Sequence, residues 1–315
     1  MSKMNNHTIA FVLGLFDTGY TVAHMLLETG IPVIGFTENP KYEIGSHTSC
    51  FKVEVIPTPK GYNDKLLSYF LDYIKNLKMS GKLSIDHKPI LFPCSDAFVY
   101  WIADNEEILK DHFLFEQPSL EIMKRFRDKS LQDSLAIEAG LSVPKTFEVS
   151  RTKDVDSIIN KINLDCQFPL FIKAAYVEEW TPNYDVKGFK VDSVEQLKKC
   201  LQEVLFTQSK VIVQEIIQGP ENNLYEFSAL VLNKEIVSFI ITNKIHQYPL
   251  DFGVGSLMRI ASNPQIEALA KCFINKSGIT GILNIEFKID ERDNKPRYIE
   301  TNLRCWQQIS LTKLI

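Results

Sequence analysis

Two stretches near the end of the chain, residues 282–290 and 296–304, alternate between apolar and polar positions. A short charged segment separates them, and this arrangement is typical of a β-hairpin. Near the start of the chain, two apolar runs, residues 8–13 and 31–37, enclose a segment with helical periodicity that ends at Gly30. Strand, helix and strand at this spacing predict a βαβ unit, and therefore a parallel sheet.

The rest of the chain continues these two patterns. Apolar runs at residues 51–56 and 89–93 predict further strands of the first sheet, with an amphipathic helix at 64–79 between them. Later segments predict a mixture of strands and helices: strands at 169–175 and 210–219, a hairpin of 224–232 with 235–244, and a helix at 264–276 that has proline near its first turn and glycine after its end.

The polar face of the C-terminal hairpin carries the strongest candidate chemistry. If its turn is centred near Asp293, Glu286 lies opposite Glu300 and Asn284 lies opposite Asn302. Two carboxylates opposed across a strand pair repel each other, so we expect a cation between them. The alternative is a solvated outer face, but the set of acids and amides in register favours a metal site. Oxygen ligands of this kind suit Mg²⁺ or Mn²⁺, with Glu286, Glu300 and Asn302 as the predicted ligands.

Arg304 lies two residues beyond Asn302 and is expected on the same face, together with Tyr298. It is placed to reach an anionic group bound by the metal. Glu286 and the run Glu-Thr-Asn-Leu-Arg at 300–304 resemble the metal and phosphate motif of the ATP-grasp superfamily. Members of that superfamily are ligases that activate a carboxylate with ATP.

The resemblance implies an α/β fold class. We expect an N-terminal Rossmann-like pre-ATP-grasp domain at residues 1–118, followed by a two-lobed ATP-grasp domain of the α+β type. Its first lobe is expected at 119–206 and its second at 207–315. Relatives in the branch that the chain resembles continue beyond the residue matching Trp306, so we expect this chain to be short at its C-terminal end, where the missing part would help to close the acceptor side.

The resemblance also assigns two lysines to ATP. Lys129 follows an aspartate and opens a predicted helix, as does the superfamily lysine that contacts the phosphates. Lys173 is the one lysine of an apolar strand, where an ammonium group is costly without an anionic partner. It matches the second ATP lysine, and with Arg304 it is a predicted catalytic residue.

Further nucleotide contacts are expected in the last third of the chain. The strand that ends at glycine resembles the hinge that grips adenine, with the backbone from Glu215 to Ile217 meeting the base and Glu215 as the polar contact. The alternative for this segment, an edge strand that ends in a turn, has the same hydropathy. Glu221 is the candidate for the ribose hydroxyls. Lys244 is expected to bind phosphate or the substrate carboxylate.

The turn after the first predicted strand, residues 14–19, lacks the GxGxxG fingerprint, although Glu38 lies where a dinucleotide fold has its ribose-binding acid. We therefore do not expect a nicotinamide cofactor, and Gly14 is expected simply to permit a tight turn. Asp17 and the pair Ser95–Asp96 follow predicted strand ends, where ligands bind in such sheets. They are candidates for substrate contact and equally for helix caps.

One segment departs from much of the superfamily. Where many members cover the triphosphate with a glycine-rich loop, residues 176–190 contain one glycine and several bulky side chains. Lys187 or Lys190 is a candidate to cover phosphate with side-chain charge instead, or the loop lies open until substrate binds. This departure resembles the branch of predicted carboxylate–amine ligases that includes D-aspartate ligase.

The composition of the chain limits the kinds of binding partner that we expect. The 315 residues are 45% hydrophobic and 23% charged, with a net charge of −4, so nothing favours a nucleic-acid or membrane-surface partner. We find no apolar run of membrane-spanning length and no signal peptide. Six scattered cysteines without metal spacing predict reduced thiols in a cytoplasmic protein. The sequence leaves the oligomeric state open, a homodimer included.

The resemblance implies an ATP-dependent carboxylate–amine ligase that forms an amide or peptide bond through an acyl phosphate, with ATP and Mg²⁺ or Mn²⁺ as cofactors. Its substrates are expected to be a small carboxylate and an amine, in the first place amino acids. Alternatives are a carboxyphosphate-forming enzyme like carbamoyl-phosphate synthase or biotin carboxylase, a Mg-ATP-binding protein that has lost catalysis, and a plain dinucleotide-binding protein.

Overall fold

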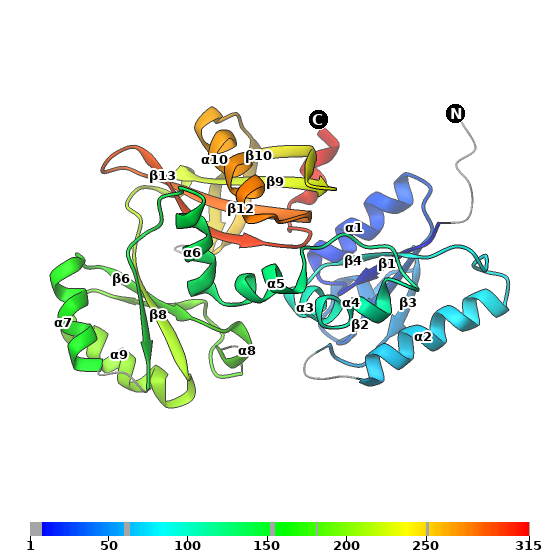
Figure 1. Ribbon diagram of the computed structural model, residues 1–315, viewed down its shortest axis with the longest axis horizontal. Helices are drawn as coiled ribbons and strands as arrows, with labels where there is room; N and C mark the ends of the chain where they lie inside the picture. Colours follow the sequence, from blue (N-terminus) through cyan, green and yellow to red (C-terminus); the bar gives the residue numbers. More distant parts are fainter. Residues whose placement is uncertain (1–7, 60–63, 152–154, 181, 250–251, 315) are drawn as a thin grey trace.

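The computed structural model describes residues 8–59, 64–151, 155–180, 182–249 and 252–314. Within this part of the chain, the strands form three sheets, which Figure 1 shows as three bodies. The N-terminal body is coloured blue to cyan. Helix α5 (Leu120–Arg127) leads from this body to helix α6 (Lys129–Glu138), which lies between the two others.

The N-terminal sheet is parallel and has the strand order β3-β2-β1-β4. Its strands are β1 (Ala10–Leu13), β2 (Val33–Thr37), β3 (Lys52–Val55) and β4 (Ile90–Pro93). Its helical segments are α1 (Asp17–Glu28), η1 (Ile44–His47), α2 (Asp64–Met79), α3 (Asp96–Asp104) and α4 (Glu106–Leu109). The expected βαβ unit is confirmed, as is the tight turn at Gly14, which has a φ of 86°.

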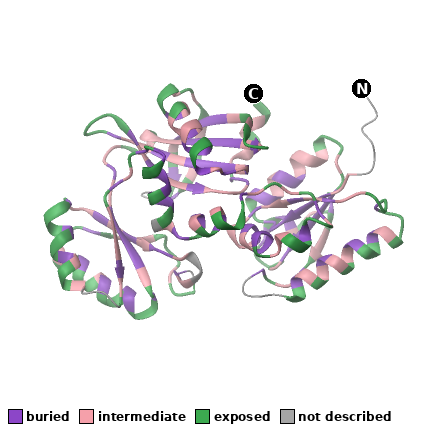
Figure 2. Ribbon diagram, viewed as in Figure 1, coloured by how far each residue is buried: buried purple, intermediate pink, exposed green. Residues whose placement is uncertain are grey.

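Both faces of this sheet are covered, as a parallel sheet requires. Phe70 of α2 and Trp101 of α3 pack with Phe11 and Phe36 on one face. Val22 of α1 packs on the other. Figure 2 shows the strands as largely buried, whereas α2 is exposed along its outer side. The strand order reverses between β1 and β4, and at such a point the carboxyl ends of the strands open toward a ligand crevice.

The second sheet is antiparallel, with the order β5-β8-β6-β7. It consists of β5 (Thr146–Ser150), β6 (Leu170–Ala174), β7 (Gly188–Val191) and β8 (Lys210–Glu215). The helices α7 (Val155–Asp165), α8 (Val177–Trp180) and α9 (Val194–Thr207) accompany it. Val211 and Val213 of β8 pack into the core under α7 and α9, so Lys210, Ile212 and Gln214 face the opposite side of the sheet.

The third sheet is antiparallel, with the order β11-β10-β9-β12-β13. Its strands are β9 (Leu224–Leu232), β10 (Glu235–Tyr248), β11 (Val254–Ile260), β12 (Gly281–Asp290) and β13 (Lys295–Asn302). The short helices η2 (Glu221–Asn223) and η3 (Ile309–Leu314) flank it, and α10 (Pro264–Ser277) packs on it. The predicted ends of α10 are confirmed: Pro264 lies in the first turn, and Gly278 ends the helix in a left-handed conformation.

The hairpin of β12 and β13 has the predicted register. Glu286 pairs with Glu300, and Asn284 pairs with Asn302. The expected face of Tyr298 is wrong, because a β-bulge follows Glu286 and brings Phe287 opposite Tyr298. The phenol ring is therefore fully buried on the core face instead of lying beside Glu300.

Sheet membership does not follow the expected lobe boundary between residues 206 and 207. That boundary falls at the last residue of α9, before β8, whereas β8 completes the sheet of β5 to β7. Helix α6, expected in the first lobe, packs its apolar side on the third sheet through Leu135 and Ala136, and Ala139 directly after its end joins them. The division into domains stays a prediction, and α6 belongs to the interface between the two lobes. Among the described residues, no helix is long and apolar enough to span a membrane.

Substitution of Phe273 tests the packing of the core between α10 and the third sheet. Its fully buried ring lies 5.4 Å from the ring of Tyr298 and 6.3 Å from that of Phe126, measured between centroids. Phe273→Ala leaves a cavity and should lower the free energy of unfolding by about 3–5 kcal/mol in urea titrations. Phe206 is 85% exposed, so Phe206→Ala should change it by less than about 0.5 kcal/mol. Equal losses in the two variants would contradict this packing.

Candidate active site

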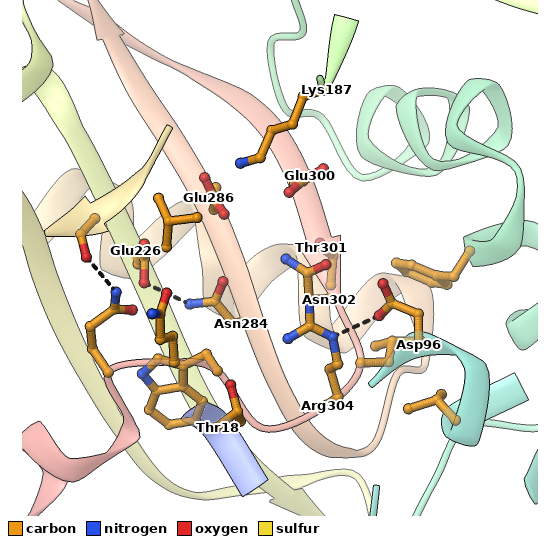
Figure 3. Close-up of a pocket in the computed structure, with 18 of the residues that line it drawn as sticks. Thr18, Asp96, Lys187, Glu226, Asn284, Glu286, Glu300, Thr301, Asn302 and Arg304 are labelled. Carbon is orange, nitrogen blue, oxygen red and sulfur yellow. Dashed lines mark hydrogen bonds and ion pairs between the residues drawn. The ribbon is translucent and has the colours of Figure 1, made fainter. Parts of the chain in front are cut away.

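Two cavities of about 630 and 620 Å³ meet in the middle of the molecule. We call the first cavity A: it lies between the N-terminal domain and the third sheet, and Figure 3 shows its lining. We call the second cavity B: it lies between the second and third sheets. Both cavities are lined by one charged group, which we call the junction: Lys129, Lys187, Lys244, Glu286 and Glu300.

At the junction, lysines offset the two opposed carboxylates. The Lys129 Nζ atom lies 2.9 Å from a carboxylate oxygen of Glu300, and the Lys244 Nζ atom lies 3.7 Å from one of Glu286. The attraction of Lys129 holds the pKa of Glu300 well below its usual range, and Glu300 in turn raises the pKa of Lys129. Both groups are therefore charged at neutral pH.

A third acid, Glu226, lies next to Glu286 and was not among the residues predicted from the sequence. It lies on β9 directly opposite Glu286 and is 5% exposed. Its carboxylate accepts a hydrogen bond from the Asn284 amide (3.1 Å), and the Lys244 Nζ atom lies 3.8 Å away. Burial, followed by repulsion from Glu286, raises the pKa of Glu226 to about 7. The signal in the sequence was a single acid within the apolar run of residues 224–232.

The predicted metal ligands fit a hard cation in their chemistry. Glu286, Glu300 and Asn302 offer carboxylate and amide oxygens beside the junction, and Mg²⁺ commonly takes one or two carboxylates together with substrate phosphates. Within the described residues, no group of three or more acidic, histidine or cysteine side chains has the arrangement of a complete protein metal site. A cation here would need ligands from phosphate and water, so the metal assignment stays a proposal.

Lys173 projects from β6 into cavity B. Its Nζ atom donates a hydrogen bond to the side-chain oxygen of Gln214 (2.9 Å) on the neighbouring strand β8. Burial, assisted by the positive charge of Lys129, lowers the pKa of Lys173 to about 8. An anion bound in cavity B would restore the charged form of this lysine.

The predicted hinge lines the same cavity. Glu215 ends β8, and Ile217, which is 8% exposed, follows it along the cavity wall. The Glu215 carboxylate is already engaged, because Arg292 of the hairpin turn donates to it at 2.6 Å. Glu221, the predicted ribose contact, also lines cavity B and accepts a hydrogen bond from the Gln247 backbone N–H (3.2 Å).

Arg304 lies in cavity A, where it meets the N-terminal domain. Its Nε atom donates to an Asp96 carboxylate oxygen at 2.7 Å, as Figure 3 shows. Asp96 is the first residue of α3, so the sequence left open whether it caps a helix or contacts substrate. The structure places it in the cavity lining and in an ion pair with Arg304. Asp17 also lines cavity A and accepts a hydrogen bond from Gln307 (3.1 Å).

The loop without a glycine-rich phosphate motif supplies one of the junction lysines. Lys187 lines both cavities, and in Figure 3 its side chain points toward Glu286 and Glu300. Lys190 lines neither cavity and lies 3.7 Å from Asp192. Of these two lysines from the sequence analysis, Lys187 is the one that lines the cavities, and a role in phosphate binding stays a prediction. Residue 181 of this loop lies outside the described residues.

Comparison with known proteins identifies the fold. No family model matches the sequence. The chain is 24% identical over 266 residues to a D-aspartate ligase of Enterococcus faecium (strain Aus0004), a match that covers 82% of this chain and 62% of that protein.

The chain is structurally similar to L-amino acid ligase from Bacillus licheniformis, with a TM-score of 0.66 and 14% identity over 96% of this chain and 68% of the other. It is also similar to D-alanine–D-alanine ligase from Bacillus anthracis complexed with ATP, with a TM-score of 0.61 and 10% identity over 99% and 92% of the two chains. The chain has the ATP-grasp fold.

The expected fold class is therefore confirmed: a parallel α/β domain precedes the two lobes of an ATP-grasp domain. The chain spans less than two thirds of the length of the curated relative. The geometry groups the predicted site residues as follows: Lys129, Lys244, Glu286 and Glu300 at the junction, Lys173, Glu215, Ile217 and Glu221 in cavity B, and Asn302 and Arg304 in cavity A. The chemical role of each residue stays a prediction.

The lowered pKa of Lys173 predicts unusual reactivity of this side chain in cavity B. At pH 8 about half of its amine should be neutral and nucleophilic, compared with roughly 0.4% for an ordinary lysine. In brief reductive methylation followed by peptide mass spectrometry, Lys173 should react faster than the exposed Lys199. Its rate should fall as the pH is lowered below 8, and ADP should protect it. A rate no higher than that of Lys199 would show that burial does not depress this pKa.

Proposed function

We propose that the protein is an ATP-dependent carboxylate–amine ligase that forms an amide or peptide bond. The observation that carries this proposal is the meeting of two cavities at one cluster of lysines and carboxylates. A nucleotide in cavity B would bring its phosphates to the junction, and a second substrate in cavity A would reach the same point from the other side. This arrangement suits transfer of a phosphoryl group between two bound molecules.

We assign cavity B to ATP. The backbone from Glu215 to Ile217 would contact the adenine, and Glu221 would contact the ribose hydroxyls. Lys173 and Lys129 would offset the negative charge of the phosphates, with Lys244 at the far side of the junction. Mg²⁺ or Mn²⁺, held through Glu286, Glu300 and Asn302, would supply further charge neutralisation on the phosphates.

The reaction that we propose has two steps. An oxygen of the carboxylate substrate attacks the γ-phosphorus, which forms an acyl phosphate as the bond to the β-phosphate oxygen breaks and ADP leaves. An amine nitrogen then attacks the acyl carbon, the carbon–oxygen bond to phosphate breaks, and the amine proton is lost. Arg304 would hold the anionic acyl phosphate in cavity A. Because the enzyme forms no covalent bond, the scheme needs no nucleophilic side chain.

The sequence similarity to a D-aspartate ligase supports amino acids as substrates, and we propose small carboxylates and amines of that class. We place the reaction in the cytoplasm, where ATP is available and where the six free cysteines would stay reduced. A homodimer stays a prediction.

The experiment that tests this function is ADP release with Mg-ATP and a panel of D- and L-amino acids, alone and in pairs. Release that requires one amino acid, and amide formation with a second, would support the ligase. ADP release that depends on bicarbonate instead would favour a carboxyphosphate-forming enzyme. If ADP binds in calorimetry but no condition gives turnover, the chain is a nucleotide-binding protein without ligase activity.

Glu300 is the side chain on which this site depends most. Glu300→Gln removes the negative charge opposite Glu286 and beside Lys129, so substrate-dependent ADP release should fall about a hundredfold or more. The fold should persist, as checked by circular dichroism and thermal unfolding. Glu291→Gln makes the same chemical change at an exposed residue after β12 and should keep full activity. Unchanged ADP release by Glu300→Gln would remove the metal assignment.

A further inference from the structure

One buried charged cluster lies outside both cavities. Lys210 begins β8, and only 14% of its side chain is exposed. It is not part of the lining of cavity A or cavity B. Burying an ammonium group is costly unless anionic partners surround it, so the groups around Lys210 must stabilise its charge.

Lys210 is held by two acids and an aromatic ring from three different segments. Its Nζ atom lies 2.7 Å from a carboxylate oxygen of Asp128 and 3.1 Å from one of Glu148 on β5. It also stands 4.9 Å from the centre of the Tyr176 ring. The Tyr176 hydroxyl donates to the same oxygen of Asp128 at 3.0 Å. The cluster therefore joins two strands of the first-lobe sheet, β5 and β8, to Asp128, which lies outside that sheet.

Asp128 occupies the point at which α6 begins. Its backbone oxygen accepts hydrogen bonds from the N–H groups of Leu131 and Gln132, which start the helix, and Lys129 is its direct neighbour. The far end of α6 is fixed elsewhere, because Ala136 and Ala139 pack on the third sheet. Helix α6 thus spans the two lobes. The Lys210 cluster attaches Asp128, directly before the helix, to the first lobe, and the Gln214 amide of β8 donates to the Asp133 carboxylate one turn further on (3.5 Å).

Removal of the Lys210 charge would act on Lys129 through this attachment. Asp128 and Glu148 both lie within ion-pair distance of the Lys210 ammonium, so loss of its charge removes an attraction that holds Asp128 against β5 and β8, and Asp128 shifts. Because Asp128 begins α6, its displacement shifts the Lys129 backbone. The Lys129 amine would then lose its position at 2.9 Å from Glu300 in the junction.

We propose that Lys210 is a positioning residue of the site: through Asp128 and Tyr176 it fixes the start of α6, and so places the Lys129 ammonium for the phosphates of a bound nucleotide. The proposal rests on the function proposed above, in which Lys129 binds phosphate. It assigns a part in nucleotide binding to a residue that touches neither cavity.

Nucleotide affinity measures this role directly. Isothermal calorimetry with Mg-ADP should show that Lys210→Met weakens binding by about tenfold, which corresponds to loss of one charge-assisted contact. Lys210→Arg keeps a cation between Asp128 and Glu148 and should restore affinity to within about threefold of the wild type. Tyr176→Phe removes one hydrogen bond to Asp128 and should have an intermediate effect. In turnover assays, Lys210→Met should raise the KM for ATP and leave the KM for the carboxylate substrate unchanged.

Arg151→Met is the matched control for lost stability. The Arg151 guanidinium ties the end of β5 to the backbone oxygens of Leu205 and Phe206 in the same lobe, and it lines neither cavity. This variant should lose thermal stability but bind Mg-ADP within about twofold of the wild type. The proposal is overturned if Lys210→Met binds Mg-ADP like the wild type. It is equally overturned if affinity falls in step with melting temperature across all four variants.

The outcomes also separate this proposal from the proposed function. If the wild type binds Mg-ADP but turns over no carboxylate, the ligase assignment fails, while the affinity ratios still decide the role of Lys210. If the wild type turns over substrate and Lys210→Met retains its KM for ATP, the ligase stands and the positioning role is rejected. If the wild type binds no Mg-ADP, both proposals fail.

Discussion

The repulsion between opposed carboxylates governs the centre of this molecule. Two unit charges about 4 Å apart repel by about 4 kcal/mol at the effective dielectric constant of a protein surface, and Glu226 adds a third acid beside Glu286 and Glu300. A folded protein can hold three carboxylates this close together only when cations nearby offset their repulsion. Here Lys129 of α6 and Lys244 of β10 supply positive charge beside the three acids. A metal ion bound together with a nucleotide would offset the negative charge that remains.

The surrounding architecture brings these opposing charges together from separate bodies. The acids lie on adjacent strands of one antiparallel sheet, whereas Lys129 begins a helix that bridges the lobes and Lys173 projects from the sheet across cavity B. The N-terminal domain contributes Asp96, which engages Arg304 on the other side. The site is therefore complete only where three bodies meet, and its two cavities approach the junction from opposite sides.

The sequence predicted those parts of the site that follow from local periodicity. The register of Glu286 with Glu300 came from alternation and one turn position, and the structure confirms it. Tyr298 was misplaced because a β-bulge shifts the period by one residue without any mark in the hydropathy pattern. Glu226 and Lys210 were missed for another reason. Glu226 is the single charge of β9 and Lys210 begins the apolar run of β8, and only tertiary structure shows which partners stabilise each of them. The pairing of β8 with β5 and β6 was not visible in the sequence either, because several helices separate these strands along the chain.

The central claim is that a nucleotide in cavity B directs its phosphates to a metal ion between the two opposed glutamates. The most direct test is a crystal structure with ADP and Mn²⁺, in which anomalous scattering locates the metal. The account predicts a manganese peak between Glu286 and Glu300, in contact with ADP phosphate oxygens, and adenine beside Ile217. Manganese bound away from these two side chains, or adenine in cavity A, would contradict it.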